Sequence, residues 1–232
     1  MAVGILVLGP CGSGKTFSLG TLDPKSTVYI NADKKSMPFK GWREVYNAEN
    51  KNYIVSSTSQ DIARYIEVLS AKRPDVKVIC IDTISSIMSD KEMAEIKKKA
   101  YDKWIDYAAD IYELFKLTQS EVLREDLYIV FLGHTEEWKD NHITKHRLKS
   151  GGAKLTNLNV EGKLTYTFYT EVEFNEGKPE YFFVTQSDGT TTARTPHGCF
   201  ERRIPNDLGS IIKRIEEFEH SKEPDEIFKK SK

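Results

Sequence analysis

Residues 9–16 read Gly9-Pro10-Cys11-Gly12-Ser13-Gly14-Lys15-Thr16 and match the pattern GxxxxGK[ST]. An apolar run from Val3 to Leu8 comes directly before this octet and predicts a buried strand. We expect a helix from Lys15 to Leu22 after it. A glycine-rich turn that matches by chance rarely lies between a strand and a helix. The octet therefore predicts a loop that binds the phosphates of a nucleotide.

Each residue type in the octet has a chemical role. Glycines let successive backbone N–H groups close around the phosphates, Lys15 reaches the β- and γ-phosphate oxygens, and the Thr16 hydroxyl is a ligand for Mg²⁺. We therefore expect ATP and Mg²⁺ as cofactors. We assign nucleotide binding to the octet and the residue after it, namely Gly9, Pro10, Cys11, Gly12, Ser13, Gly14, Lys15, Thr16 and Phe17.

The composition is that of a chain with one substantial core. Of its 232 residues, 39% are hydrophobic and 30% are charged. We expect one domain over residues 1–220 and a charged, disordered tail over residues 221–232. The formal net charge of −1 excludes a globally basic coat for nucleic acid, so any contact with nucleic acid must use a local patch.

Membrane, secretory and disulfide signals are missing from the sequence. No apolar stretch approaches the length of a membrane span, and the N-terminus lacks the basic region and cleavage site of a signal peptide. We therefore expect no membrane partner and a cytoplasmic location. Cys11, Cys80 and Cys199 are odd in number and form no CxxC pair, which favours reduced thiols over disulfides or a zinc site.

Strands and helices alternate after the octet. Three apolar or β-branched runs predict strands at Thr27–Asn31, Val76–Ile81 and Leu127–Leu132. Helical spacing predicts one helix over Ser59–Lys72 and a long one over Ser89–Glu121. The core-facing residues expected in the long helix are Ile105, Ala108, Ile111, Leu114, Phe115 and Thr118. This order predicts an α/β fold with a mostly parallel, doubly wound sheet.

The pattern changes after Gly133. Residues 136–159 are polar, so we expect a long surface loop there. The β-rich runs Lys163–Val172 and Tyr181–Thr185 predict a β-hairpin on the edge of the sheet. A final amphipathic helix is expected over Asp207–His220, with an apolar face made of Ile211, Ile212, Ile215 and Phe218.

Two acids follow predicted strands. Asp82 ends the run Val78-Ile79-Cys80-Ile81-Asp82 and is our candidate for organising Mg²⁺ together with Thr16, although a strand-ending Asp can also simply cap a turn. The next residue is Thr83, so the glutamate general base of many ATPases is missing there. Asp33 lies just beyond the second strand and is the best replacement. Its other interpretation is a turn acid beside two lysines.

These residues together resemble the RecA-like branch of P-loop ATPases, over roughly Val3 to Pro196. In that family the catalytic acid ends the strand after the phosphate loop, the Walker B strand ends in Asp and a small hydroxyl residue, and a polar sensor ends the next strand. The resemblance implies a RecA-like P-loop NTPase fold with the β-hairpin as a C-terminal extension. It also implies that the catalytic residues are Lys15, Asp33, Asp82 and His134, with His134 as the sensor.

Two of these positions depart from the family, which usually has Glu at the catalytic acid and often Gln at the sensor. Because Asp is a methylene shorter than Glu, Asp33 affects the expected rate of hydrolysis more than nucleotide binding. The chain is most similar to short phage-encoded RecA-like ATPases that act in single-strand annealing or recombination. This similarity rests on Asn31-Ala32-Asp33-Lys34-Lys35 and Pro38-Phe39-Lys40-Gly41.

In RecA-like recombinases the loop after the fourth strand binds single-stranded DNA. Here that loop carries five basic residues with Asp140 as the one acid among them, and Trp138 is placed to stack on a base. The DNA-binding residues that we expect are Trp138, Lys145, Arg147, Lys149 and Lys154, with Lys139 nearby. The alternative interpretation is an ordinary solvated basic loop.

The resemblance also implies a homo-oligomer, as a ring or filament, with a single-strand-binding protein as a further candidate partner. Arg194, Arg202 and Arg203 are the candidates for an arginine finger that reaches a neighbour's γ-phosphate. Each of them can equally be an ordinary surface or salt-bridge arginine.

The sequence as a whole predicts a Mg²⁺-dependent ATPase, stimulated by single-stranded DNA, that assists annealing or recombination. One alternative is a small-molecule or nucleoside kinase, although no Arg-rich lid segment lies between the third and fourth strands. The other is a nucleotide-dependent switch or assembly protein with little hydrolysis, which Asp33 in place of Glu permits.

Overall fold

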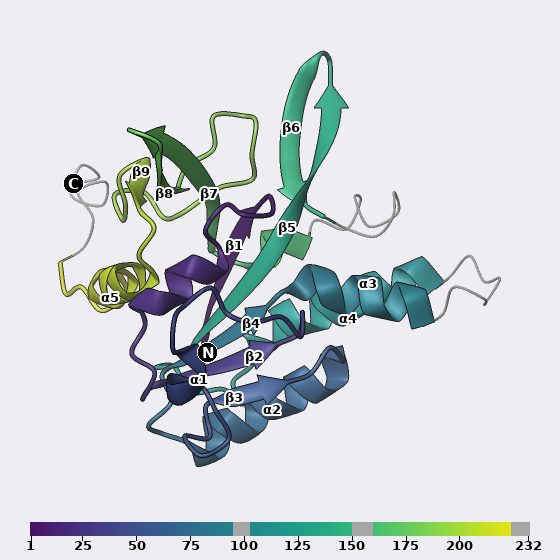
Figure 1. Cartoon of the computed structure of the whole chain (residues 1–232), viewed down its shortest axis with the longest axis vertical. Coiled ribbons are helices and arrows are strands. Elements are labelled where there is room, and N and C mark those ends of the chain that lie inside the picture. Colours follow the sequence, from purple (N-terminus) through teal and green to yellow (C-terminus); the bar gives the residue numbers. More distant parts are fainter. Residues whose placement is uncertain (95–102, 150–159, 224–232) are drawn as a thin grey trace, which may run out of the picture.

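A nine-stranded sheet forms the centre of the molecule in this computed structural model, which describes residues 1–94, 103–149 and 160–223 (Figure 1). The strand order is β3-β2-β4-β5-β1-β7-β8-β9, and β6 pairs with β5 off this path. The strands are β1 Val3–Gly9, β2 Thr27–Asn31, β3 Tyr53–Val55, β4 Val78–Asp82, β5 Tyr128–Asp140, β6 Ile143–Leu148, β7 Tyr166–Asn175, β8 Lys178–Val184 and β9 Arg203–Pro205.

The strands from β3 to β7 along this order run parallel to their neighbours. Strand β5 lies between β1, which leads into the phosphate loop, and β4, which ends in Asp82. All three strands therefore direct their carboxyl ends to one edge, where ligands bind in open parallel sheets. This arrangement confirms the predicted α/β fold of the RecA-like P-loop type.

The predicted C-terminal hairpin is also present and extends the sheet beyond the phosphate loop. Strand β7 pairs parallel with β1 and antiparallel with β8, and β9 adds to the far side of β8. The last helix, α5 (Leu208–Glu219), begins where the Asp207 side chain accepts a hydrogen bond from the Ser210 N–H. Its residues Ile211 and Ile215 are buried, as the helical spacing predicts.

Alternating side chains divide the core into two clusters, one on each face of the sheet. Leu6 and Leu8 of β1 face the first cluster, which includes apolar residues of α2 (Ser59–Lys72), α3 (Ile84–Ala94) and α4 (Lys103–Leu117). Ile5 and Val7 face the second cluster, which includes residues of α5 and of the segment after the phosphate loop. Helices thus cover both faces of the sheet (Figure 1).

The helix expected over Lys15–Leu22 is instead a six-residue 3-10 helix, η1 (Thr16–Thr21). Two features keep it short. Leu22 is already extended ahead of the Asp23-Pro24 turn, and Gly20 is a weak helix former. A Cβ at Gly20 would lie 2.6 Å from Cε1 of Phe39, so the ring packs directly on the backbone of η1.

The single long helix expected over Ser89–Glu121 is wrong, because the segment contains two helices packed against each other. Helix α3 begins five residues early at Ile84, and α4 ends at Leu117, where the Thr118 hydroxyl bonds back to the Phe115 carbonyl. The residues between them, 95–102, lie outside the described residues, as do the side chains of Ile105 and Ala108. The other expected core residues are buried, namely Ile111, Leu114, Phe115 and Thr118.

The surface loop expected from residue 136 is also wrong for residues 136–148, which form an antiparallel hairpin that stands away from the body (Figure 1). Strand β5 continues to Asp140, and the turn uses Asn141 and His142 with φ of 46° and 72°. Two residues with positive φ form the type of tight turn that fits strand twist, and Asn is favoured there. We name residues 135–148 the β5–β6 hairpin. Residues 150–159, including Lys154, lie outside the described residues.

Small elements without a counterpart in the sequence prediction include α1 (Trp42–Val45) and the strands β3 and β9. The 3-10 helix η3 (Val160–Lys163) leads into β7. Among the described residues, no helix combines the length and the apolar character needed to cross a membrane. Residues 224–232 of the expected tail are not among the described residues.

The packing of β5 against α4 yields a prediction about stability. Phe131 is fully buried, and its ring centroid lies 4.8 Å from that of Phe115. We expect Phe131→Ala to lower the free energy of unfolding by about 3–5 kcal/mol because it leaves a cavity in the central strand. Denaturant unfolding measures this loss. Val122→Ala, at a side chain that is 70% exposed, should change stability by about 0.5 kcal/mol or less, and equal losses in both variants would contradict the packing.

Candidate functional site

The phosphate loop joins β1 to η1 at the edge where the parallel strands end. Gly14 has a φ of 90°, and a Cβ there would lie 2.6 Å from Cδ1 of Tyr181. At Gly9 a Cβ would lie 1.8 Å from the Thr170 hydroxyl. Thr170 in turn shares a 2.5 Å hydrogen bond with the Ser13 hydroxyl. Both glycines are therefore required by close packing against the β7–β8 hairpin.

Lys15 is buried within this loop. Its ammonium donates to the carbonyls of Gly9 at 2.8 Å and Pro10 at 2.7 Å. Burial lowers the pKa of Lys15 to about 8, against the raising effect of nearby Cys11 and Asp82. The side chain thus remains mostly charged at neutral pH. It is the cation that the phosphate loop holds in place.

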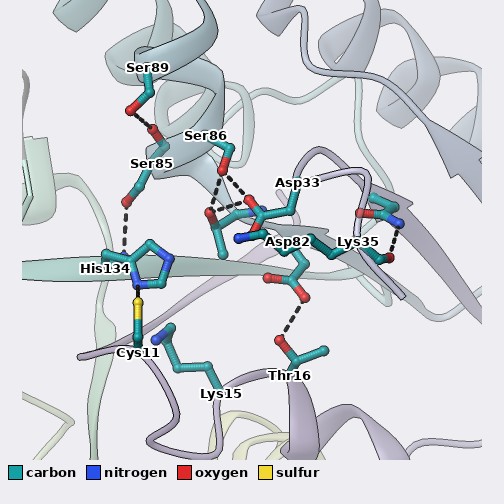
Figure 2. Close-up of polar contacts among 12 residues, drawn as sticks. Cys11, Lys15, Thr16, Asp33, Lys35, Asp82, Ser85, Ser86, Ser89 and His134 are labelled. Carbon is teal, nitrogen blue, oxygen red and sulfur yellow. Dashed lines mark hydrogen bonds and ion pairs between the residues drawn. The ribbon is translucent and has the colours of Figure 1, made fainter. Parts of the chain in front are cut away.

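Thr16 and Asp82 form the second part of the site. The Thr16 hydroxyl donates to Asp82 Oδ2 at 2.8 Å (Figure 2). The Tyr29 hydroxyl donates to the same oxygen at 3.0 Å. Burial raises the pKa of Asp82, while the hydrogen bond from Thr16 works against this rise. A hydroxyl and a carboxylate side by side are hard oxygen ligands, which suit Mg²⁺.

These two groups are the metal ligands that the chain offers at this place. Within the described residues, no group of three or more His, Cys, Asp or Glu side chains is arranged to hold a metal. Mg²⁺ commonly keeps waters and phosphate oxygens and uses only one or two protein ligands, so Thr16 and Asp82 fit it.

Asp33 lies opposite Asp82 and accepts several hydrogen bonds. Its Oδ1 accepts from the Thr83 hydroxyl at 2.8 Å, from the Thr83 N–H at 3.2 Å and from the Ser86 hydroxyl. Its Oδ2 pairs with the Lys35 ammonium at 2.8 Å. Burial would raise the pKa of Asp33, but the hydrogen bonds from Lys35, Ser86 and Thr83 outweigh it and hold the pKa below its ordinary value.

His134 lies where β5 leaves the parallel sheet. Its backbone N–H donates to the Ser85 hydroxyl at 2.9 Å, and its ring Nδ1 lies 3.8 Å from Cys11 Sγ on the phosphate loop. Burial, followed by the positive charge of Lys15, lowers the pKa of His134, so the ring is neutral at pH 7. The ring thus faces Cys11 of the phosphate loop (Figure 2), and the next residue, Thr135, begins the β5–β6 hairpin.

One cavity of about 350 Å³ brings most of the predicted site residues together. It is lined by Cys11, Gly12, Ser13, Gly14, Lys15, Thr16, Phe17, Asp33, Asp82 and His134. Gly9 and Pro10 do not line it, and their carbonyls instead hold Lys15. The lining residues that the sequence prediction missed are Tyr29, Lys35, Ser36, Pro38, Thr83 and Tyr181.

The missed residues differ in whether the sequence carries a signal for them. Lys35 and Thr83 each lie within two residues of a predicted site acid, and this proximity along the chain is a signal for both. Tyr29 lies on β2, where alternation places it on the opposite face from Ile30. Tyr181 comes from β8 and has no local signal, because only the tertiary pairing of β7 with β1 brings it to Gly14.

The predicted DNA-binding residues lie outside this cavity, on the β5–β6 hairpin. Arg147 pairs with Glu136 at 2.9 Å, and its guanidinium lies 4.9 Å from the centre of the Trp138 ring. Lys145 pairs with Asp140 at 2.6 Å. The expectation of a single acid needs correction, because Glu136 and Glu137 belong to the same hairpin. Residues 135–149 hold four basic and three acidic side chains and are only weakly positive.

The three arginine-finger candidates all have partners away from the cavity. Arg194 bonds to the backbone carbonyls of Leu164 and Glu161. Arg202 pairs with Asp188 at 3.2 Å, and Arg203 pairs with Glu171 and Glu173 at 2.7 and 2.8 Å. Within its own subunit, none of the three lines the phosphate-loop cavity.

The fold and the site define a P-loop ATPase. Residues 1–197 match the model of a protein family described as an AAA domain, and the chain belongs to that family. No curated protein matches significantly. A solved structure of a KaiC-like protein from the hyperthermophilic archaeon Pyrococcus horikoshii is similar, with 12% identity, 84% of this chain and 83% of that chain covered, and a TM-score of 0.47.

The contact between Thr16 and Asp82 predicts a change in metal dependence. We expect Asp82→Asn to raise the Mg²⁺ concentration needed for half-maximal ATP turnover by about tenfold or more, because the metal loses an anionic partner. A Mg²⁺ titration of the ATPase rate measures this shift. Asp126→Asn, which removes an exposed carboxylate paired with Lys77, is the control. If both variants keep the parent's Mg²⁺ dependence, Asp82 does not serve the metal.

Proposed function

We propose that this chain is a cytoplasmic Mg²⁺-dependent ATPase that binds single-stranded DNA and assists annealing or recombination. The observation that carries this proposal is the continuity of β5. Its sheet end places His134 in the phosphate-loop cavity, and the same strand continues into the exposed hairpin that bears Trp138 (Figure 1). One continuous strand therefore connects the nucleotide site to the proposed DNA surface.

Residues of the cavity have separate roles in ATP hydrolysis. Lys15 binds the β- and γ-phosphate oxygens, and Thr16 and Asp82 hold Mg²⁺, which neutralises developing charge when bound. Asp33 orients the attacking water through a carboxylate that is already ionised at neutral pH. In a loose phosphoryl-transfer transition state, positioning of this kind contributes more than proton removal.

The hairpin supports DNA binding through the side chains that share one of its faces. Trp138 lies opposite Lys145, and Glu136 lies opposite Arg147, so Trp138, Lys145 and Arg147 point to the same side. An aromatic ring with neighbouring cations is the usual surface for an unpaired base and its phosphate. Here the cations must exchange their carboxylate partners for phosphate, which weakens the net affinity.

A hydrogen bond also links the hairpin's end to the sensor. The Lys149 N–H donates to the His134 carbonyl at 2.7 Å. Binding of DNA phosphate at Lys149 would therefore act on the backbone of a residue that lines the nucleotide cavity. We propose DNA-stimulated turnover on this basis.

Other parts of the proposal rest on the resemblance of residues 31–41 to short phage-encoded ATPases of annealing and recombination. They are the phage origin, the assembly into a ring or filament and a single-strand-binding protein as partner. A nucleotide-dependent switch with little hydrolysis is the second candidate. The specific observation in its favour is the Asp33 carboxylate, whose four hydrogen bonds and lowered pKa make it a weak base.

Fluorescence anisotropy with a labelled single-stranded oligonucleotide across a salt series tests the DNA surface. Replacing Lys145, Arg147 and Lys149 together by Ala should weaken binding and reduce the slope of log K against log salt by about 2, because each lost phosphate contact removes about 0.7. The matched control replaces three exposed lysines elsewhere, Lys25, Lys72 and Lys213, and removes the same charge.

Two results would contradict the DNA proposal. One is a parent protein with no measurable affinity for single strands. The other is an equal loss of slope in the hairpin variant and the control, which would indicate a general charge effect. ATP turnover measured with and without the oligonucleotide then separates the two candidates, because the switch predicts little hydrolysis in either condition.

A further inference from the structure

Two lysines line the phosphate-loop cavity, Lys15 and Lys35. The phosphate-loop pattern accounts for Lys15. Lys35 comes from the turn after β2, and its side chain is 73% exposed although its ammonium lies 2.8 Å from Asp33 Oδ2. This second cation lies beside the acid proposed to orient water and has no assigned role.

The backbone of this turn is held so that Lys35 points back to Asp33 (Figure 2). Lys34 has a φ of 56°, a left-handed conformation that costs a non-glycine residue about 1 kcal/mol or more. The buried Asn31 side chain donates to the Lys35 carbonyl at 2.7 Å and to the Tyr53 hydroxyl at 2.9 Å. The position of Lys35 therefore follows from the end of β2 and its pairing with β3.

The charge of Lys35 acts on two other groups that line the cavity, Lys15 and His134. After burial, which is the main cause, the Lys35 ammonium helps to lower the pKa of both Lys15 and His134. The hydrogen bond that Lys35 donates to Asp33 raises the pKa of Lys35, so its ammonium stays charged at neutral pH. A triphosphate held by Lys15 would lie within the field of this second cation.

We propose that Lys35 is a catalytic residue that supplies, from the same subunit, the cation that stabilises charge on the γ-phosphoryl group during hydrolysis. This role rests on the ATPase function proposed above. Water bonds to the γ-phosphorus while the bond to the β,γ-bridging oxygen breaks, giving ADP, inorganic phosphate and one proton released to solvent. Lys35 keeps its own proton throughout and moves from Asp33 toward the phosphoryl oxygens.

The ion pair with Asp33 holds the Lys35 ammonium near the cavity before the nucleotide binds. A lysine on an exposed turn samples many rotamers, and a carboxylate partner limits them at small cost to stability. Because Asp33 also binds Thr83 and Ser86, the pair ties Lys35 to the end of β4 and the start of α3. The cation is thus positioned by the same network as the water-orienting acid.

Steady-state kinetics with a matched neighbour test the proposal. We expect Lys35→Ala to lower kcat about 100-fold or more with ATP affinity little changed, the usual loss when one preorganised transition-state donor is removed. Lys35→Arg should recover part of kcat. Lys34→Ala removes an equal charge one residue away, from a lysine paired with Asp90 at 3.6 Å and outside the cavity, and should retain the parent's rate.

A second measurement separates contact with phosphate from positioning of Asp33. The affinities of Lys35→Ala for ADP and for ADP with aluminium fluoride, a mimic of the transferring phosphoryl group, are compared with those of the parent. We expect the mimic to bind at least about tenfold more weakly and ADP to bind unchanged. Unchanged affinity for the mimic, or an unchanged kcat, would overturn the role of Lys35. A parent that binds no ATP would instead overturn the ATPase function itself.

Discussion

The hydrogen bond between Thr16 and Asp82 depends on most of the fold, because it joins residues 66 positions apart. It forms only when β5 is inserted between β1 and β4 in parallel register, so that the phosphate loop and the acid strand end at one edge. Those strands are buried on both faces and need helices on each side. The two core clusters therefore stabilise the strands that bring the Thr16 hydroxyl to 2.8 Å from Asp82 Oδ2.

Two charged side chains are buried at this edge of the sheet, and their burial determines its electrostatic properties. Lys15 and Asp82 are both buried, and burial shifts the pKa of each toward the neutral form. The nearby opposite charge of each group works against this shift. Asp82 also accepts hydrogen bonds from Thr16 and Tyr29, and Lys15 donates to the loop carbonyls. Donors fixed in this way need little rearrangement when charge develops on a phosphoryl group. Asp33 and Lys35 extend the same arrangement to the more exposed side of the cavity.

Local sequence signals predict the phosphate loop and the single strands of the parallel sheet, because the octet and each apolar run consist of residues adjacent in the chain. The errors came where tertiary structure decides. Polar residues after His134 looked like a loop, but strand pairing through the Asn141–His142 turn makes them a hairpin. The long helix was split between α3 and α4, because periodicity alone does not reveal where a chain reverses. Tyr181 reached the cavity only through the pairing of β7 with β1. Site residues contributed by long-range pairing have no local signature.

The central claim is that this cavity binds ATP through the phosphate loop. Equilibrium titration of a fluorescent ATP analogue in the presence of Mg²⁺, with the parent and with Lys15→Ala, tests it most directly. Loss of a charged hydrogen-bond partner should weaken binding by about 10- to 100-fold, while the unfolding midpoint stays close to the parent's. Lys25→Ala, at an exposed position outside the cavity, should bind like the parent. A Lys15→Ala protein that is folded and binds the analogue as tightly as the parent would contradict the account.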